Sequence, residues 1–541
     1  MTRTRAVPAP RRGRGAAAAL CAAACVLAAI ATVAPAEESA RIPNALLPFD
    51  MPTAAELQAS PREVVAHWFL WPVSADNDPP SRDAYADALA GERFVWDSHL
   101  RARPLPRPQR FTSSWRAADA AAEIRLAQAM GIDAFHVLID KGKKPANHRP
   151  DPPDAIRLLQ AAHDLDTGFR VSPLITCGSC DRAGEYGHWR NNPPGEVADF
   201  VLGELADAGL EDSPALHRRD GRVVFGAYRV TAAPVAWWLG VKDAFAARGV
   251  AIDLMCVFNG LGHRGRAETY DPVCDLWTDW GTRTLREAAR DQGEVWAAVA
   301  PEPAAATINQ QDYRHRPEGD EIGSENLGSR LLRTTWEAAI AAPTELAHLV
   351  TWNDYGEHSS FMPTTATQFA FYDLNAYYIT WFKTGTPPPI ERDALYFFHR
   401  VHHGPPWTRI FGDEAADWAN RIELVGFLTA PGTLEVETAD GVTRREVAAG
   451  LQVLTAPLPR EGRPRFRLMR EGEVIVAVTS PFAVRRTDEA GLDLVYRAGG
   501  SLRMAHGARR PAAACAEDGT PAERPDACLS PALGEPVWLA R

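Results

Sequence analysis

Two carboxylates lie three residues apart in the stretch TWNDYGE. Asp354 and Glu357 stand beside Trp352 and Tyr355, and an apolar run at 346–350, typical of a buried strand, comes just before them. Two like charges in a partly desolvated segment repel each other, which tends to keep one carboxyl protonated while the other ionises. The crowding therefore predicts that one of the two carboxyls can act as a general acid at the end of a strand, while the second carboxylate could activate water or attack as a nucleophile.

Short apolar runs and stretches of helical periodicity alternate from residue 61 to the acid pair. The predicted strands are 64–69, 134–140, 170–176, 223–228, 252–258, 273–277, 295–300 and 348–352, and the predicted helices are 113–130, 154–165, 196–210, 235–248, 284–292 and 328–342. Such alternation indicates parallel strands joined by crossover helices, and eight strands match a (β/α)8 barrel. The alternative is an open doubly wound sheet, which would usually carry a glycine-rich phosphate turn after its first strand.

The pattern changes near residue 410, where strands become short and alternate with period two. We predict strands at 422–429, 433–438, 442–447, 465–469 and 474–478, with turn signals such as Pro431-Gly432 and Asp440-Gly441 between them. This is typical of a small antiparallel β-sandwich. The predicted organisation is a signal peptide at 1–36, a catalytic barrel at 37–405, the β-sandwich at 410–500 and an irregular Cys-containing tail at 501–541.

The first 36 residues resemble a secretory signal. They hold five arginines and no acid, then an Ala-rich apolar run and the small-x-small sequence Ala34-Pro35-Ala36. The alternative is an uncleaved anchor helix. Removing these arginines would take the net charge from −11 to −16, which disfavours nucleic acid and anionic membranes as partners. We expect a secreted or periplasmic protein that does not contact the membrane after signal cleavage.

Six of the eight cysteines lie beyond this segment, and export favours an oxidising compartment. Cys515 and Cys528 flank a polar tail and are expected to pair. Cys177 and Cys180 form a CxxC without further zinc ligands beside it, so we expect a local disulfide there. Cys256 and Cys274 could also pair, or could be buried thiols.

In a (β/α)8 barrel the active site lies at the carboxyl ends of the strands. Beside the acid pair, we expect these positions to contribute substrate-binding residues: His67, Trp68, Asp140, Tyr228, Asn259, Asp275, Trp277, Asp279, Trp352, Asn353 and Tyr355. Acids with aromatic platforms are typical of glycoside hydrolysis. Neither a metal motif such as HExxH nor a GxSxG elbow occurs, so we expect no metal and no cofactor.

Each of these residues also has a structural interpretation. An Asp that ends a strand is often the N-cap of the next helix, and Asp140 could instead pair with Lys141 or Lys143. A buried Trp is more often part of a core than a platform, and His67 could be a satisfied core histidine. Asp354 and Glu357 are harder to interpret in this way, because two adjacent acids repel each other.

The run TWNDYGE resembles the signature of glycoside hydrolase family 71, the α-1,3-glucanases or mutanases. Weaker similarities to this family follow in the right order, in the stretches VVAHWFL, AQAMGIDAFHVLID and DLNAYYITWFKTGTPPPIERDALYFFHRVH. A related acid-x-x-Glu pattern occurs in the family 99 endo-α-mannosidases. The resemblance implies a secreted, inverting, endo-acting α-glucanase in which Asp354 and Glu357 carry the reaction. We assign Glu357 as general acid and Asp354 as general base. Asp275 and Asp279 could position the sugar or replace one member of the pair.

Two stretches depart from the family pattern. After DYGE this chain has His358-Ser359-Ser360 in place of Ser-His-Tyr, and the third strand ends in LITCGSC instead of a Phe- and Asp-rich run. Both lie where substrate subsites are expected. The predicted function is hydrolysis of an α-linked glucan, with α-1,3-glucan favoured. The alternatives are an endo-acting hydrolase of another α-linked glycan such as α-mannan, and an inactive carbohydrate-binding protein. The expected partner is a polysaccharide, and the oligomeric state stays open.

Overall fold

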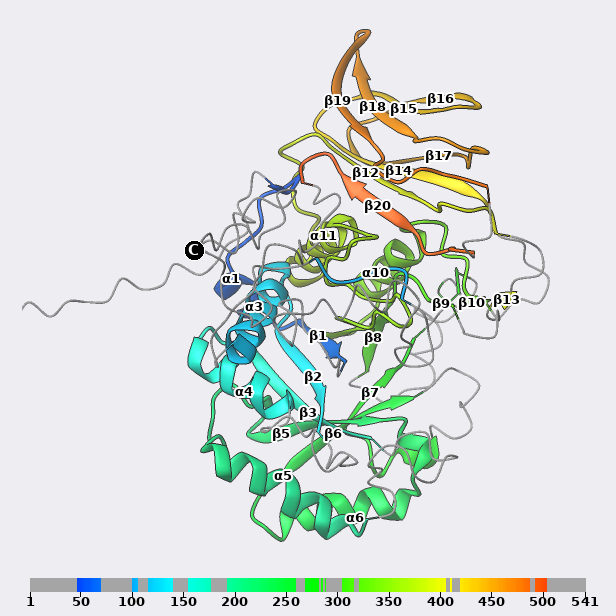
Figure 1. Ribbon diagram of the computed structural model, residues 1–541. Coiled ribbons are helices and arrows are strands. Elements are labelled where there is room, and N and C mark those ends of the chain that lie inside the picture. Colours follow the sequence, from blue (N-terminus) through cyan, green and yellow to red (C-terminus); the bar gives the residue numbers. More distant parts are fainter. Residues whose placement is uncertain are drawn as a thin grey trace, which may run out of the picture. The chain divides into compact units, whose positions relative to one another are not determined.

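The structure is a computed structural model, in which the chain divides into two units at 1–38 and 39–541. The described residues all belong to the second unit: 46–69, 100–105, 115–139, 154–176, 192–258, 268–281, 284–285, 288, 304–315, 321–404, 409–410, 419–486 and 492–503. Figure 1 shows the helices and strands of this unit.

Eight parallel strands form a nearly closed barrel. They are β1 (Glu63–Trp68), β2 (Ala134–Leu138), β3 (Arg170–Thr176), β5 (Arg222–Tyr228), β6 (Ile252–Phe258), β7 (Leu276–Asp279), β8 (Ala305–Ile308) and β11 (Leu346–Leu349). Each pairs in parallel with its neighbour in the order β7-β6-β5-β3-β2-β1-β11-β8, and a parallel bridge between Trp277 and Ala304 joins the two ends. The two-residue strand β4 (Arg218–Arg219) pairs with β5 outside this circle. The predicted barrel is confirmed.

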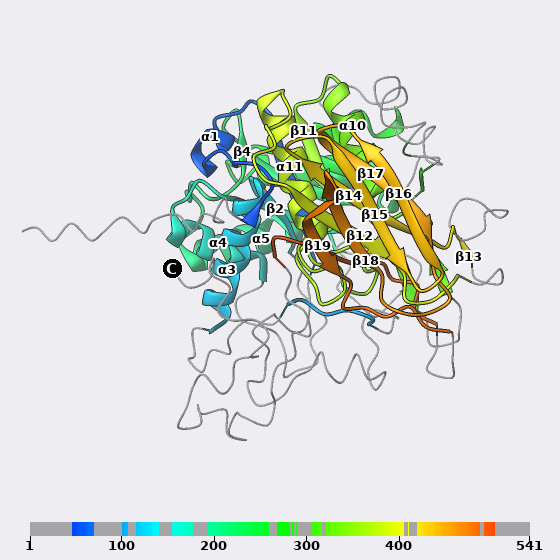
Figure 2. The same ribbon diagram turned by 90° about the horizontal axis from the view of Figure 1, so that it is seen from above.

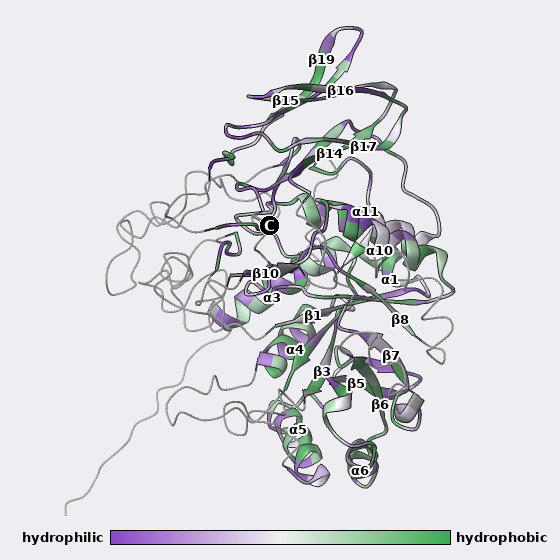
Figure 3. Ribbon diagram, turned by 90° about the vertical axis from the view of Figure 1, so that its right-hand side faces the viewer, coloured by the Kyte–Doolittle hydropathy of each residue, from purple (hydrophilic) through white to green (hydrophobic). Residues whose placement is uncertain are grey.

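Helices follow most barrel strands in the described part of the chain. They are α1 (Ala54–Gln58), α3 (Trp115–Met130), α4 (Asp154–Leu165), α5 (Pro194–Ala208), α6 (Val235–Ala246), α10 (Arg330–Ala341) and α11 (Ala370–Thr384), with short 3-10 turns at Val230–Ala232 and Glu268–Tyr270. Figure 3 shows both hydrophobic and hydrophilic residues along α5. Its apolar side chains Val197, Val201 and Leu205 are buried, as expected for a helix that covers a sheet.

Three strands differ from their predicted positions. The seventh barrel strand is β8, and the predicted segment 295–300 lies outside the described residues. The sequence of β8, AATI, is rich in alanine, which is a weak strand former, so this strand is inconspicuous in the sequence. The sixth strand begins at Leu276 because Val273 and Cys274 donate their amides to Tyr270 in a turn. The eighth strand ends at Leu349, before the predicted 352.

The barrel interior has an apolar lower layer and a polar middle layer. The lower layer is a buried cluster of side chains from seven strands: Val65, Ala134, Val224, Met255, Leu276, Ala305 and Leu346. Two residues further along β1, β2 and β11 lie the buried side chains of His67, His136 and His348. Thr278 Oγ1 of β7 is 3.2 Å from His348 Nδ1. Side chains alternate across each strand, so the next inward positions reach the carboxyl end of the barrel.

Two four-stranded antiparallel sheets follow the barrel. The first has the order β17-β14-β12-β20 and the second β16-β15-β18-β19. Their strands are β12 (Ala394–His399), β14 (Arg421–Leu428), β15 (Gly432–Thr438), β16 (Gly441–Val447), β17 (Gly450–Pro457), β18 (Arg465–Arg470), β19 (Glu473–Thr479) and β20 (Arg497–Gly500). Side chains of both sheets share one buried cluster that includes Phe397, Leu424, Leu434 and Phe466. Figure 2 shows the strands of the two sheets overlapping in the view from above.

All five strands predicted for this region occur, while β12, β17 and β20 were not predicted. Strand β12 lies before residue 405, yet it pairs with β14 and β20 in the first antiparallel sheet. A small third sheet has the order β13-β10-β9, with β9 at Tyr313–His315, β10 at Glu321–Gly323 and β13 at Arg409–Ile410.

Buried ion pairs connect the first antiparallel sheet to the barrel. Arg400 donates to both carboxylate oxygens of Glu325, at 2.8 and 3.1 Å. Arg333 of α10 donates to Glu423 of β14 at 2.7 Å, and Arg503 pairs with Asp373 of α11. Because breaking one partner leaves the other charge buried, these pairs hold the sheet to the barrel in one arrangement.

A disulfide joins Cys256 of β6 to Cys274, just before β7. The sequence left this pair open, and the predicted pairs Cys177–Cys180 and Cys515–Cys528 lie outside the described residues. Within the described residues, no helix combines the length and the apolar character that a membrane span requires.

Candidate active site

The acid pair lies on a tight turn that follows β11. Thr351 Oγ1 accepts the amide of Asp354 at 2.9 Å, and Asp354 Oδ1 accepts the amide of Glu357 at 2.9 Å. The amide of Ser359 donates to the carbonyl of Asp354 at 3.1 Å. These local bonds orient the Asp354 carboxylate and place Glu357 at its side. Asp354 is 3 % exposed, whereas the Glu357 side chain is 21 % exposed, so the pair has one inner and one outer member.

The turn is anchored to the carboxyl end of β1. The amide of Trp352 donates to the carbonyl of His67 at 2.7 Å. The Asn353 amide group bonds both backbone groups of Phe69, accepting from its N–H at 2.6 Å and donating to its carbonyl at 3.1 Å. Asn353 therefore fixes the acid turn to the first strand with its side chain.

The other side of the turn is anchored to the segment after β8. The Tyr313 amide donates to the carbonyl of Glu357 at 2.9 Å, and Gln310 Nε2 donates to the carbonyl of Ser360. Because β8 and β1 are the two neighbours of β11 in the barrel, the acid pair is held from both sides.

Arg314 brings a guanidinium to the outer acid. Its NH2 lies 2.8 Å from Glu357 Oε1, and its Nε and NH2 lie 3.1 and 3.0 Å from the two oxygens of Asp312. Burial disfavours the charged guanidinium, but the carboxylates of Asp312, Glu357 and Asp354 outweigh this and raise the pKa of Arg314. The site is therefore a cluster of three acids around one arginine.

The segment His358-Ser359-Ser360 packs beneath the turn. His358 Nδ1 donates to the carbonyl of Tyr313 at 2.7 Å and its Nε2 accepts the amide of Arg101 at 2.9 Å. Burial lowers the pKa of His358 to about 4, so the ring is neutral at ordinary pH. Ser360 Oγ donates to the carbonyl of Trp352 at 3.0 Å. These three residues, which depart from the family pattern, are buried supports of the acid turn.

An aromatic cluster closes the barrel interior below the acid turn. His67 of β1 lies 4.6 Å from Trp280 and 5.8 Å from Tyr228, measured between ring centroids, and Tyr228 lies 4.5 Å from Trp280. Val350, which immediately precedes the acid turn, belongs to the same cluster. Burial, followed by the nearby His348, lowers the pKa of His67 well below its usual value. The structure thus brings His67 and Tyr228 together at the expected end of the barrel.

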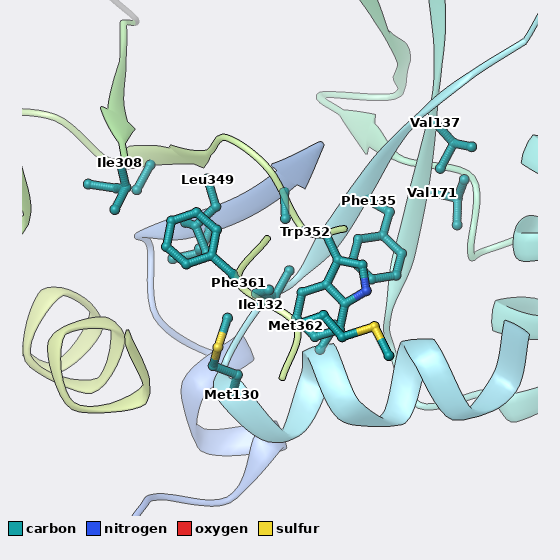
Figure 4. Packing of buried hydrophobic residues seen from close by; sticks show 14 of the residues in the cluster. Met130, Ile132, Phe135, Val137, Val171, Ile308, Leu349, Trp352, Phe361 and Met362 are labelled. Carbon is teal, nitrogen blue, oxygen red and sulfur yellow. The ribbon is translucent and has the colours of Figure 1, made fainter. Parts of the chain in front are cut away.

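Trp352 and Tyr355, expected to contact substrate, are placed in the hydrophobic core. Trp352 is fully buried, its Nε1 donates to Glu123 Oε2 at 2.6 Å, and its ring lies 5.5 Å from that of Phe135. Figure 4 shows Trp352 beside Phe135 and Met362. The Tyr355 hydroxyl contacts Met362 Sδ at 3.1 Å. These residues belong to a turn and not to a strand, so their side chains do not alternate between two faces, and Trp352 and Tyr355 both join the large hydrophobic cluster.

Asp275 lies at the opposite end of its strand from the acid pair. It precedes β7, where its carboxylate pairs with Lys242 Nζ at 2.7 Å and accepts the amide of Leu254 at 2.8 Å. Trp277 is buried and stacks on Phe258 with ring centroids 5.1 Å apart. Both positions are explained by the later start of β7. Asp275 precedes the strand and so lies away from its carboxyl end.

Two further expected residues lie near strand ends. Asp279 is the last residue of β7, is buried, and accepts the amide of Trp280 on Oδ1 at 2.7 Å. Trp68 ends β1 and packs against the large hydrophobic cluster around the barrel. Asp140 and Asn259 lie outside the described residues. Within the described ranges, no cluster of three or more His, Cys, Asp or Glu side chains could hold a metal ion.

The sequence interpretation missed the polar string that follows β8. Asn309, Gln310, Gln311 and Asp312 are all buried there, and Arg314 follows them. Asn309 Nδ2 has no hydrogen-bond partner within the described residues. The available signal was the sequence ATINQQDYR itself, a short apolar run followed by five polar residues among six. It was passed over because the seventh strand was expected earlier in the chain.

A parallel eight-stranded barrel with acids and aromatic residues beyond its strand ends has the architecture of a barrel glycosidase. The family model described as glycosyl hydrolase family 71 matches residues 110–490. The chain belongs to glycoside hydrolase family 71, and it is therefore a glycoside hydrolase.

One curated relative is a mutanase of Penicillium rubens. The two are 27% identical over 164 residues, which cover 26% of this chain and 36% of that protein. The match thus spans little more than a third of the relative's length. Among solved structures, the family 99 endo-α-mannosidase of Bacteroides thetaiotaomicron has a TM-score of 0.42 and 14% identity, over 60% of this chain and 98% of that one. An Anoxybacillus α-amylase has a TM-score of 0.37 and 10% identity, over 73% and 98%.

Proposed function

We propose that this protein is a secreted, endo-acting hydrolase of an α-linked glucan, with α-1,3-glucan as the favoured substrate. Membership of family 71 and the similarity to a mutanase support the substrate class. The observation that carries the catalytic assignment is the turn after β11, where Asp354 Oδ1 accepts the amide of Glu357 and both acids share one end of the barrel.

Asp354 and Glu357 carry the reaction by inversion. Glu357 is the outer acid and protonates the leaving glycosidic oxygen, while Asp354 removes a proton from the water that attacks the anomeric carbon. His67, Tyr228 and Trp280 offer aromatic faces below the reacting sugar. The two antiparallel sheets form a β-sandwich accessory domain, and residues 1–36 direct export.

Reducing-end release from a panel of insoluble α-glucans and α-mannan tests this function. Wild type is expected to act on α-1,3-glucan, and Glu357→Gln and Asp354→Asn are each expected to lose about 10²–10⁴-fold in rate. Glu446→Gln, which changes an exposed acid on β16, is the matched control and should keep full activity. If the protein acts on α-mannan alone, the proposed glucan substrate is wrong. If Glu357→Gln is fully active, Glu357 takes no part in the reaction.

Binding distinguishes an enzyme from an inactive carbohydrate-binding protein. If wild type and Glu357→Gln both sediment with α-1,3-glucan and neither releases reducing ends from any glycan, the protein binds without turnover. If wild type releases reducing ends and Glu357→Gln only binds, the catalytic proposal stands.

A further inference from the structure

Arg314 contacts the acid pair but has no role in the mechanism proposed above. Its guanidinium is fixed by a fork of two contacts to Asp312, at 3.1 and 3.0 Å, and Asp312 is only 1 % exposed at its side chain. A bidentate arginine–carboxylate pair fixes direction as well as distance. The same NH2 group that contacts Asp312 also lies 2.8 Å from Glu357 Oε1.

The backbone around Arg314 is locked to the same turn. On one side of it, Tyr313 donates its amide to the carbonyl of Glu357 and accepts His358 Nδ1 on its own carbonyl, at 2.9 and 2.7 Å. On the other side, β9 pairs with β10 in the small third sheet. Arg314 is therefore held in place by Asp312, by its strand and by the backbone of the acid turn, in addition to its contact with the Glu357 side chain.

We propose that Arg314 is a positioning residue for the reaction, which aims the Glu357 carboxylate at the glycosidic oxygen. This inference rests on the proposed function of the Asp354–Glu357 pair. The charged groups that face Glu357 in the described residues are Arg314 from β9, Asp312 from the preceding segment and Asp354 from the same turn.

The proposal predicts a split between catalysis and binding. Arg314→Met should lower kcat on α-1,3-glucan by about 10²-fold, because a displaced carboxylate no longer meets the glycosidic oxygen. KM should change within about twofold, since Arg314 acts through Glu357 and not on the sugar. Arg314→Lys keeps the charge but loses the fork to Asp312, so it should recover part of the lost kcat.

The lysine variant and a matched control separate positioning from a structural role. A loss that is merely structural would not be recovered by Arg314→Lys, because lysine also loses the fork to Asp312. Arg333→Met is the matched control, because it breaks the comparably buried pair with Glu423 in α10 and β14. It should lower the melting temperature and leave kcat close to the wild-type value. An equal loss of kcat in both variants would overturn the proposal.

Two further outcomes distinguish this inference from the proposed function. If Glu357→Gln keeps full activity, the proposed function of the acid pair fails, whatever the effect of Arg314→Met. A crystal structure of Arg314→Met gives a readout independent of turnover, in which the Glu357 carboxylate should leave the position where Arg314 NH2 contacts its Oε1 in the wild type. A carboxylate that stays in place overturns the positioning, whatever glycan the wild type cleaves.

Discussion

At the scale of single residues, neighbours on the acid turn have unlike roles. Asp354 and Glu357 lie at the barrel mouth, while Trp352 and Tyr355 between and beside them are buried in the core outside the barrel. The side-chain amide of Asn353 accepts a hydrogen bond from the backbone N–H of Phe69 and donates one to its carbonyl. The conspicuous aromatic residues of this stretch thus support the acids mechanically, and the proposed function assigns sugar stacking to His67, Tyr228 and Trp280 instead.

Trp352→Phe tests this division. The substitution removes the indole N–H that donates to buried Glu123 and should lower the free energy of unfolding by about 1–3 kcal/mol. KM for α-1,3-glucan should stay within about twofold of wild type, because the ring faces Phe135 and α3. The measurements are urea unfolding and steady-state kinetics. A large rise in KM with unchanged stability would make Trp352 a substrate platform.

At the scale of elements, the closure between β7 and β8 is the least regular part of the barrel. Within the described residues, a single parallel bridge, Trp277 to Ala304, joins these strands, whereas β6 and β7 pair over four residues. The disulfide Cys256–Cys274 ties the start of β7 to β6. Its position next to the closing strand suggests that it keeps β7 in register with the rest of the barrel.

The double variant Cys256→Ala/Cys274→Ala is expected to be less stable by about 3 kcal/mol. The estimate follows from the loop entropy of a cross-link with a sequence separation of 18. Urea unfolding with and without reductant measures it. Reductant should destabilise wild type and have a much smaller effect on the double variant. Equal unfolding midpoints for wild type and variant in the absence of reductant would show that the bond contributes no stability.

At the scale of the whole molecule, three neutral histidines make the barrel sensitive to acid. Burial, reinforced by neighbouring histidines, lowers the pKa of His67 and of His136 well below the usual value. Burial alone lowers the pKa of His348 to about 3. Unfolding releases each ring to an ordinary pKa near 6.5, so the unfolded chain binds protons that the folded chain refuses.

Stability should therefore be complete above pH 6.5 and fall as the pH is lowered toward 3. Each neutral buried histidine contributes a slope of about 1.4 kcal/mol per pH unit in this range. His136→Leu removes one of these rings and should reduce the slope of the unfolding free energy against pH by about that amount. Leucine breaks no hydrogen bond there, because neither ring nitrogen of His136 has a partner within the described residues. The matched control His403→Gln changes an exposed histidine and should keep the wild-type slope. An unchanged slope in His136→Leu would contradict the prediction.

The barrel and the place of the acid pair follow from the sequence by itself. Hydrophobic periodicity is a local property, so eight alternating units and an acid pair after the last strand can be predicted without any contact in hand. The five strands between 421 and 479 follow from period-two patterning and turn residues for the same reason. The family signature then connects this pair to glycoside hydrolysis.

Tertiary structure alone decides which residues meet at the site. Arg314 and Asp312 reach Glu357 only because β8 and β11 are neighbours in the barrel, and no local pattern encodes that contact. The start of β7 at Leu276 puts Asp275 at the far end of the barrel. Packing turns Trp352 toward Glu123, more than two hundred residues away in the chain. Long-range contacts depend on strand register and side-chain packing, which the whole chain determines together.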